Sequence, residues 1–339
     1  MSELSIPGLR SLPKVDLHRH LDCSMRWSTL IELAPQVGIE LPLDPRRQRE
    51  EFLITSPMRD LESVLKKFLR AQKVLASTEI LERLAFEACE DTYNDGVIVM
   101  EMRYAPTFIV DGHPSLDFQS VHLALHRGIE RAKKRFPIAA GLIGIVQRIK
   151  PLAEAERVVD FVIDHKDSFI GLDLADNEDG FNPLLFAPLF TRAKKAGLRI
   201  TIHSGEIPHA QSPQWVKDSV EILGAERIGH GIQIINNPQV LEFIRNRKIP
   251  LEVCPHSNWL TQAFPDHSSH PVRRLREAGV VVTINSDDPG LFASTLTDDY
   301  EILQRVHKFT AAEFAAMNED AIRASFLPAA DLRKVWTSP

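Results

Sequence analysis

Eight short apolar runs, each followed by a longer amphipathic stretch, limit most strongly what this sequence can fold into. The runs span residues 15–20, 97–104, 138–146, 169–175, 199–205, 227–232, 250–255 and 280–288. Most of them are continuously apolar, which is typical of parallel strands that are buried on both faces. The intervening segments 78–94, 120–135, 153–165, 185–196, 215–223, 238–246 and 272–278 have the spacing or the end signals of helices.

Strands that alternate with helices predict a parallel sheet, and eight strands are the number that closes a (β/α)8 TIM barrel. An open, doubly wound sheet is the alternative. That architecture would be expected to carry a glycine-rich phosphate turn after an early strand, and the sequence has neither a GxGxxG nor a Walker-type loop. We therefore predict an α/β fold of the TIM-barrel type.

The length of 339 residues suits one barrel with additions, since such barrels take about 250 residues and more with insertions. Two stretches fall outside the alternation. Residues 27–80 carry helical patterns over 27–37 and 60–75, and we interpret them as a helical insertion after strand 1 that covers one end of the barrel. Residues 296–337 are predicted to be a C-terminal helical extension. We thus expect residues 1–339 to form a single barrel domain.

Composition narrows the classes of function. The formal net charge of -6 disfavours a nucleic-acid-binding surface, which usually shows as a basic excess. The three cysteines, Cys23, Cys89 and Cys254, are too few and too widely spaced for a disulfide framework. No segment approaches the ~20 apolar residues of a membrane-spanning helix, and the first residues lack a signal-peptide pattern. We expect a cytoplasmic enzyme without nucleic-acid or membrane partners, and the oligomeric state is left open.

Catalytic residues of barrel enzymes gather at the carboxyl ends of the strands. Four of the eight runs end in residue types that bind metals or transfer protons: His18 and His20, then His203 and Glu206, then His230, and finally Asp287 and Asp288. Residues two apart on a strand point to the same face, so His18 and His20 can face one ion. Two histidines can also merely end a strand, so the pair alone is a weak signal.

His203 would add a third nitrogen and Asp287 a carboxylate, a set that suits catalytic zinc with room for water. Glu206 follows a glycine and could turn back over the metal as a general acid or base, or it could simply begin a helix. His230 lies between two glycines, and its alternative role is a buried structural histidine. His209 and His256 lie near predicted loop mouths and could line a pocket.

Five segments in this order resemble the adenosine deaminase family of the amidohydrolase superfamily: PKVDLHRHLDCSMR, HSGE, RIGHGI, EVCPHSNWLT and NSDDPGLF. Together they reach from about Leu12 to Phe292 and are far more specific than any one alone. The resemblance implies an aminohydrolase that converts adenosine or 2′-deoxyadenosine to the 6-oxo product and ammonia. Its partner would be a small purine nucleoside.

The resemblance also implies roles for single residues. One Zn²⁺ per subunit would be held by His18, His20, His203 and Asp287. Glu206 would donate a proton to purine N1, and His230 would orient or deprotonate the attacking water. The substrate would be bound by Asp288 at N7, by Asp22 at the ribose 5′-hydroxyl, by the backbone N–H of Asp176 at N3, and by Leu61, Val64 and Phe68 on a helix over the pocket.

Two departures from the family pattern bear on the substrate. Asp176 and Cys23 stand where the family usually has glycine, which keeps aminodeoxyfutalosine and 5′-modified adenosines as possible substrates. Relatives acting on free adenine tend to have glutamate at the position of Asp22, so we expect a nucleoside rather than adenine. The sequence is also compatible with a non-catalytic barrel relative or with a different metal hydrolase, for example one that acts on cyclic amides. The segment GLDLADNED lacks the lysine that bridges two metals in related barrels, which favours one metal.

Overall fold

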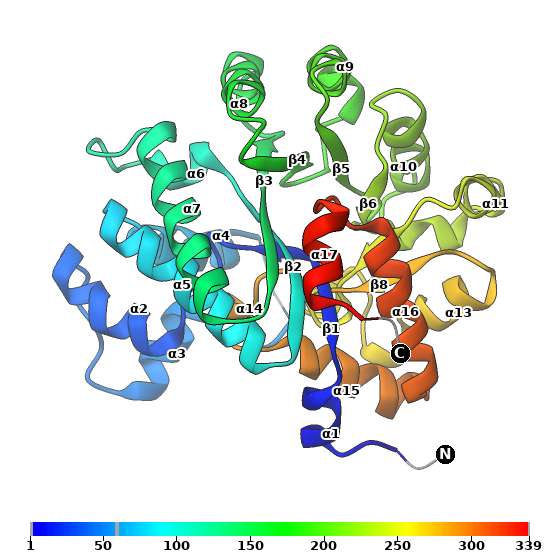
Figure 1. Ribbon diagram of the computed structural model, residues 1–339, viewed down its shortest axis with the longest axis horizontal. Helices are drawn as coiled ribbons and strands as arrows, with labels where there is room; N and C mark the ends of the chain where they lie inside the picture. The colour runs from blue at the N-terminus through cyan, green and yellow to red at the C-terminus, as the bar shows by residue number, and fades with distance from the viewer. Residues whose placement is uncertain (1–2, 58–60, 338–339) are drawn as a thin grey trace.

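Eight parallel strands follow one another around a barrel in the part of the chain that the computed structural model describes, residues 3–57 and 61–337 (Figure 1). The strands are β1 (Lys14–His20), β2 (Val97–Tyr104), β3 (Ala139–Gln147), β4 (Phe169–Ala175), β5 (Arg199–Ser204), β6 (Arg227–His230), β7 (Leu251–Val253) and β8 (Val282–Ile284). Their order in the sheet is their order in the sequence. The predicted TIM barrel is therefore confirmed.

The barrel closes where the segment after β8 meets β1. Arg19 and Asp287 form a parallel bridge there, in which the Asp287 N–H donates to His18 O at 2.9 Å and the His20 N–H donates to Asp287 O at 2.8 Å. Asn285 Oδ1 accepts the Leu17 N–H at 2.9 Å one step earlier. Closure itself thus places Asp287 beside the two histidines of β1.

The ladder between β4 and β5 pairs at only two positions. A side chain holds these strands together further along. Arg148, which is buried, donates from Nη2 to Leu174 O at 3.0 Å and from Nε to Ala175 O at 3.3 Å, and its Nη2 also contacts His203 O. The guanidinium therefore replaces ladder hydrogen bonds and fixes the end of β5, where His203 lies.

Helices surround the barrel on its outer side (Figure 1). They are α5 (Thr78–Asn94), α7 (Phe118–Arg135), α8 (Leu152–Asp164), α9 (Ala187–Lys195), α10 (Ser212–Glu221), α11 (Pro238–Arg247) and α13 (Val272–Glu277). Side-chain caps fix several of their starts, because Ser77, Asp117 and Asn237 accept backbone N–H groups of the first turn. The predicted helix 215–223 begins earlier, at Ser212, with a proline in its first turn.

Four helical segments occupy the stretch between β1 and α5: α2 (Trp27–Leu33), η1 (Ala34–Val37), α3 (Pro45–Phe52) and α4 (Leu61–Gln72). α2 and η1 match the helical pattern seen over 27–37, and α4 matches that over 60–75, whereas α3 lies outside both patterns. Phe68 of α4 is half-buried and packs with Cys23 after β1 and Phe292 after β8. This stretch therefore lies against the loops at the carboxyl ends of the strands.

The C-terminal helices α15 (Leu296–His307), α16 (Ala311–Ala324) and α17 (Ala329–Val335) pack at the opposite end. Asn318 Oδ1 accepts the Val15 N–H at the start of β1 at 2.9 Å. The carbonyl of Ala324 accepts from Arg227 Nη1 at the start of β6 at 2.9 Å. Figure 1 shows α16 and α17, in red, in front of β1 and β8. The amino end of the barrel is thus covered, and the carboxyl ends are left to the loops.

Short helices fill the remaining connections: α1 (Ile6–Ser11), α6 (Pro106–Val110), η2 (Pro183–Phe186), η3 (Ile232–Asn236), α12 (Pro255–Leu260), η4 (His267–Ser269) and α14 (Pro289–Phe292). The strands β5, β6, β7 and β8 are shorter than the apolar runs 199–205, 227–232, 250–255 and 280–288 that predicted them. β7 ends at Val253 because Pro255, which has no N–H for a ladder, begins α12. Among the described helices, none combines the length and the hydropathy that crossing a bilayer requires.

Candidate metal centre and active site

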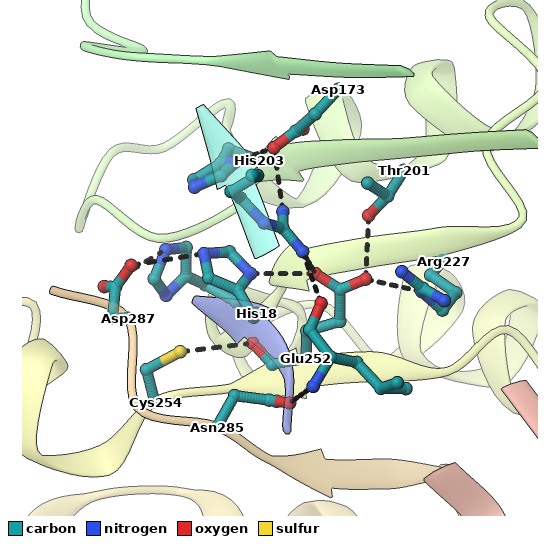
Figure 2. A network of polar contacts seen from close by, with 12 residues as sticks. His18, Asp173, Thr201, His203, Arg227, Glu252, Cys254, Asn285 and Asp287 are labelled. Atoms are coloured by element: carbon teal, nitrogen blue, oxygen red, sulfur yellow. Dashed lines mark hydrogen bonds and ion pairs between the residues drawn. The ribbon is translucent and has the colours of Figure 1, made fainter. Parts of the chain in front are cut away.

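Three histidines and one aspartate meet at the carboxyl end of the barrel. The candidate ligand atoms of His18, His20, His203 and Asp287 all lie within 4.8 Å of one another. Asp287 Oδ1 is 3.2 Å from His18 Nε2 and 3.4 Å from His20 Nε2, and the Nε2 atoms of His20 and His203 are 3.2 Å apart. The structure therefore brings together the four residues that we predicted as ligands; Figure 2 labels three of them, His18, His203 and Asp287.

The backbone of the surrounding loops is unusual. Asp287 and His230 both have a φ of 61°, in the left-handed region that aspartate and histidine tolerate better than most residues. Gly229, one residue before His230, has no room for a side chain, because a Cβ there would lie 2.9 Å from Cε1 of His18. Gly229, one of the two glycines that flank His230 in the sequence, thus allows the backbone of β6 to approach His18 closely.

A buried carboxylate lies behind each of two candidate ligands (Figure 2). His18 Nδ1 is 2.8 Å from Glu252 Oε2, and His203 Nδ1 is 2.9 Å from Asp173 Oδ2. Each carboxylate holds a proton on Nδ1, so the Nε2 lone pair of the same ring faces the cluster. Asp173 and Glu252 were missed in the sequence. A sequence signal for both residues exists, namely a single acidic residue within an apolar run. Such an acid is expected to have a charged or hydrogen-bonding partner, because acids are rarely fully buried without one.

Two buried arginines balance these carboxylates. Arg103 donates to Asp173 Oδ2 at 2.7 Å and to Glu252 Oε2 at 2.8 Å, and Arg227 Nε donates to Glu252 Oε1 at 2.6 Å. Burial opposes ionisation of Glu252, but Arg103 and Arg227 hold its pKa well below its usual value. Burial also opposes ionisation of Asp173, but His203 and Arg103 lower the pKa of that carboxyl. Both groups are therefore anionic hydrogen-bond acceptors.

The electrostatics of the cluster suit a cation. Burial lowers the pKa of His20 well below its usual value and that of His203 to about 4, so both rings are neutral near pH 7, as metal ligands must be. At His18, burial and Arg103 oppose a positive charge, but Asp287 and Glu252 outweigh them and raise its pKa. Among the described residues, none forms a hydrogen bond with the buried Nε2 of His18. These residues fit a divalent metal ion.

Glu206 lies beside this cluster. Its Oε2 is 3.5 Å from His230 Nε2, and its Oε1 accepts hydrogen bonds from Thr261 Oγ1 at 3.0 Å and from Asn258 Nδ2 at 3.5 Å. Burial, Asp287 and Glu178 raise the pKa of Glu206, although His230 opposes the shift. A carboxyl group that keeps its proton closer to neutral pH is suited to general acid catalysis.

Asp22 and Asp288 lie close to the metal cluster. Asp22 Oδ2 accepts the Ala105 N–H at 3.0 Å, whereas its buried Oδ1 has no hydrogen-bond partner among the described residues. Burial raises the pKa of Asp22 to about 7. Burial and the neighbouring carboxylates of Asp287 and Asp22 raise the pKa of Asp288 well above its usual value. Both carboxyls can therefore hold a proton at a pH at which ordinary aspartates are ionised.

Asp176 follows β4 with a φ of 85°, a backbone conformation that glycine adopts most readily. Its carboxylate accepts hydrogen bonds from Gln147 Nε2 at 3.0 Å and from the Asn177 N–H at 2.8 Å. Two of the three predicted residues of the covering helix, Leu61 and Val64, have side chains outside the described residues, and Phe68 is the one whose contacts the structure gives.

Two other predicted candidates, His209 and His256, make surface or packing contacts, and Cys254 lies beside the metal cluster. His209 is exposed and stacks on Trp215 at 4.9 Å, so it belongs to the surface. His256 is half-buried and packs near Trp259 and Phe292. Cys254 lies with His230 and Asp287 in a second group of potential ligands. Burial raises the pKa of Cys254 well above its usual value, so it stays a thiol, which is a poor ligand.

Comparison with known proteins adds independent information. The sequence model of the adenosine deaminase family matches residues 13–337. Adenosine deaminase from Shewanella denitrificans is 32% identical over 330 residues, 97% of this chain and 98% of that protein. Among solved structures, adenine deaminase from Arthrobacter aurescens is 27% identical, with a TM-score of 0.85 over 95% of this chain and 98% of that one. A zinc-bound amidohydrolase from Burkholderia ambifaria is 26% identical, with a TM-score of 0.88 over 99% and 93%.

Proposed function

Because this chain belongs to the adenosine deaminase family, we propose that it catalyses the zinc-dependent hydrolytic deamination of adenosine or 2′-deoxyadenosine. The observation that carries the proposal is the position of Glu206 and His230 beside the His18, His20, His203 and Asp287 cluster. An acid, a second proton carrier and four metal-ligand atoms thus share one buried site. A zinc-dependent hydrolytic deamination can use all three, the metal to activate water and the two proton carriers to protonate the ring and the leaving amine.

One zinc ion would be held by the Nε2 atoms of the three histidines and by a carboxylate oxygen of Asp287. This ligand set is one that zinc prefers, and the similar Burkholderia ambifaria protein contains zinc. When bound, the ion supplies Lewis acidity that brings the pKa of a coordinated water near neutral. His18 and His203 stay oriented because Glu252 and Asp173 fix their Nδ1 protons.

Glu206 and His230 would move the protons. Glu206 donates its proton to purine N1, which makes C6 electrophilic, and its raised pKa supports this role. His230, 3.5 Å from Glu206 Oε2 and 3.9 Å from Asp287 Oδ2, orients the attacking water and accepts its proton. The water oxygen bonds to C6, and His230 passes the water's proton to the amino group. The C6–N bond then breaks and ammonia leaves, while the new hydroxyl group on C6 gives its proton back to Glu206. The product is the 6-oxo purine nucleoside.

Asp288 and Asp176 would hold the base. Purine N7 accepts a hydrogen bond, so a carboxyl group that binds it must carry a proton. The raised pKa of Asp288 supports this arrangement. The backbone N–H of Asp176 would donate to N3. The backbone here is left-handed, and the carboxylate of Asp176 is bonded to Gln147, which would keep it from competing with the N–H for the base. The two aspartates together would fix the plane of the ring.

Asp22 would recognise the ribose. One of its carboxylate oxygens accepts the Ala105 N–H, and the other is buried without a hydrogen-bond partner among the described residues, so it can accept the hydrogen bond of a 5′-hydroxyl. Free adenine has no hydroxyl that could donate a hydrogen bond to this oxygen. The oxygen would then stay buried without a hydrogen bond, at a cost of about 1–3 kcal/mol. We therefore favour a nucleoside over the free base. Phe68, with Leu61 and Val64, would cover the bound substrate.

The test is ammonia release by the zinc-loaded protein from adenosine, 2′-deoxyadenosine, adenine, 5′-methylthioadenosine and aminodeoxyfutalosine, measured side by side. We expect adenosine and 2′-deoxyadenosine to be the fastest substrates. Faster release from adenine than from adenosine would contradict the role given to Asp22. Activity restricted to the 5′-extended analogues would keep the chemistry but change the substrate. If no compound of the panel released ammonia, the proposed function would be overturned.

A further inference from the structure

Glu178 is a buried acid to which the mechanism above gives no part. It lies on the loop after β4 and is 3% exposed. Its carboxylate accepts three consecutive backbone N–H groups: Gly205 on Oε2 at 2.7 Å, Glu206 on Oε1 at 2.8 Å, and Ile207 on Oε1 at 3.4 Å. No other described carboxylate is bonded to this turn. The two loops that follow β4 and β5 are therefore joined at the residue proposed to be the acid.

The turn that receives Glu178 is shaped to bind an anion. Gly205 has a φ of 74°, and a Cβ there would lie 2.5 Å from Cγ2 of Val216. Successive N–H groups that converge next to a left-handed residue form a concave site for negative charge. Here that site is occupied from within the chain, by the carboxylate of Glu178.

The carbonyl side of the same turn is fixed as well. The Gln233 N–H donates to Gly205 O at 3.0 Å, and Gln233 Nε2 donates to Glu206 O at 3.0 Å. The backbone of Glu206 is thus held on its N–H side from the loop after β4 and on its C=O side from η3. Only the torsions of the Glu206 side chain are left, and Thr261 restricts these through its hydrogen bond at 3.0 Å.

We infer that Glu178 is a positioning residue for Glu206: through its hydrogen bonds to three consecutive N–H groups it fixes the backbone that aims the acid at the substrate. This inference rests on the proposed function, because it assumes that Glu206 is the acid. A purely structural role is the alternative. In that case loss of Glu178 would disturb the fold or the metal cluster, and the effect would not depend on Glu206.

A double-mutant cycle separates the two roles. Glu178→Gln keeps the size of the side chain but turns an N–H₂ group toward one of the three backbone N–H groups. We expect kcat to fall on the order of 10–100-fold, since a displacement of about 1 Å in a catalytic group can have that effect. KM should change less than twofold. In a Glu206→Gln background, Glu178→Gln should slow the residual reaction less than twofold.

Asp179→Asn is the matched control, because Asp179 is the exposed acid next to Glu178 on the same loop. It should leave kcat, KM and zinc content at their original values. Glu178→Asp, which keeps the charge but shortens the reach, serves if the glutamine variant fails to fold. It should also reduce kcat more than KM. Equal slowing by Glu178→Gln in both backgrounds would overturn the inference.

A measurement without substrate keeps this test independent of the proposed function. Amide hydrogen exchange of the peptide containing residues 205–207, followed by mass spectrometry in the zinc-loaded protein, should be faster in Glu178→Gln than in Asp179→Asn. Equal exchange in the two variants would overturn the inference, whatever the enzyme's substrate. If the original protein deaminates nothing on the panel, the proposed function fails, whereas faster exchange in Glu178→Gln would still show that Glu178 fixes the backbone of residues 205–207.

Discussion

Single residues outside the ligand set control the cluster. Asp173 holds His203, Glu252 holds His18, and Arg103 contacts both carboxylates from within the barrel. Each carboxylate selects the tautomer that leaves Nε2 unprotonated, and the arginine offsets the cost of burying two anions. Metal affinity should therefore depend on residues that never touch the metal.

Asp173→Asn tests this dependence. Asparagine has the shape of aspartate, but its amide can no longer hold the Nδ1 proton of His203 as a charged acceptor. We expect zinc affinity to fall by about 10–100-fold, the usual effect of losing such a partner. Competition with a chromophoric chelator measures it, with Asp164→Asn, an exposed acid on α8, as control. Equal affinities of the two variants would contradict the role of Asp173.

Glu206→Gln separates the acid from the metal. The ligands are untouched, so zinc content by elemental analysis should equal that of the original protein. Turnover should fall by about 10²–10⁴-fold, because the residue can no longer donate a proton to the ring. Asp287→Ala removes a proposed zinc ligand and should therefore lower the zinc content. A Glu206→Gln variant with a near-normal rate, or an Asp287→Ala variant with full zinc, would show that the roles are wrong.

At the scale of elements, the position of the site depends on side-chain hydrogen bonds between neighbouring segments as well as on the hydrogen bonds of the strand ladder. The β4–β5 ladder is short, and Arg148 joins the two strands by donating to the carbonyls of Leu174, Ala175 and His203. The loops after β4 and β5 are joined again by Glu178. The proposed acid Glu206 and the candidate ligand His203 thus lie on β5 and the loop that follows it, whose positions are set by side chains of neighbouring segments.

Arg148→Met should lower the free energy of unfolding by about 2–4 kcal/mol, because each buried carbonyl left without a donor costs about 1–3 kcal/mol and some will find water. Urea unfolding of the zinc-loaded protein measures the change. Arg305→Met removes an arginine that is 70% exposed and should cost less than about 1 kcal/mol. If the two variants were equally stable, the contact between β4 and β5 would not depend on the guanidinium of Arg148.

A second side-chain hydrogen bond connects α15 with α12. Asp299 of α15 accepts the His256 N–H in the first turn of α12 at 2.8 Å, and α12 carries Asn258, which contacts Glu206. A carboxylate suits a helix N-terminus, but burial and the neighbouring acids raise the pKa of Asp299 well above its usual value. The folded state thus binds this proton more tightly than the unfolded state does.

The sign of the pH dependence follows. The stabilisation from the proton on Asp299 is complete below the unfolded pKa of about 4 and is lost as the pH rises toward the folded pKa. Asp299→Asn keeps an acceptor for His256 and cannot ionise. Its gain in stability over the original protein should therefore grow between about pH 5 and neutral pH in urea unfolding. A difference that does not vary with pH would contradict the raised pKa, and Asp164→Asn gives the baseline.

At the scale of the whole molecule, the barrel was predictable from the sequence because each buried strand is an apolar run long enough to recognise. The grouping of the four candidate ligands with Glu206 and His230 was predictable because these residues lie at the ends of such runs, and barrel closure brings the run ends together. The supporting residues were not. Whether Asp173 meets His203 or Glu252 meets His18 depends on the register between strands, which a local pattern does not contain. The β7 end was missed because an apolar Cys254-Pro255 step begins a helix.

The central claim is that one metal ion in this cluster is required for deamination, and a zinc titration of metal-free protein tests it most directly. Ammonia release from adenosine is followed while zinc is added stepwise, with Glu206→Gln in parallel. We expect no activity without metal, a linear rise, and a plateau at one zinc per chain, while the variant binds the same zinc and stays near the baseline. Full activity of the metal-free protein, or a plateau only at two ions per chain, would contradict the claim.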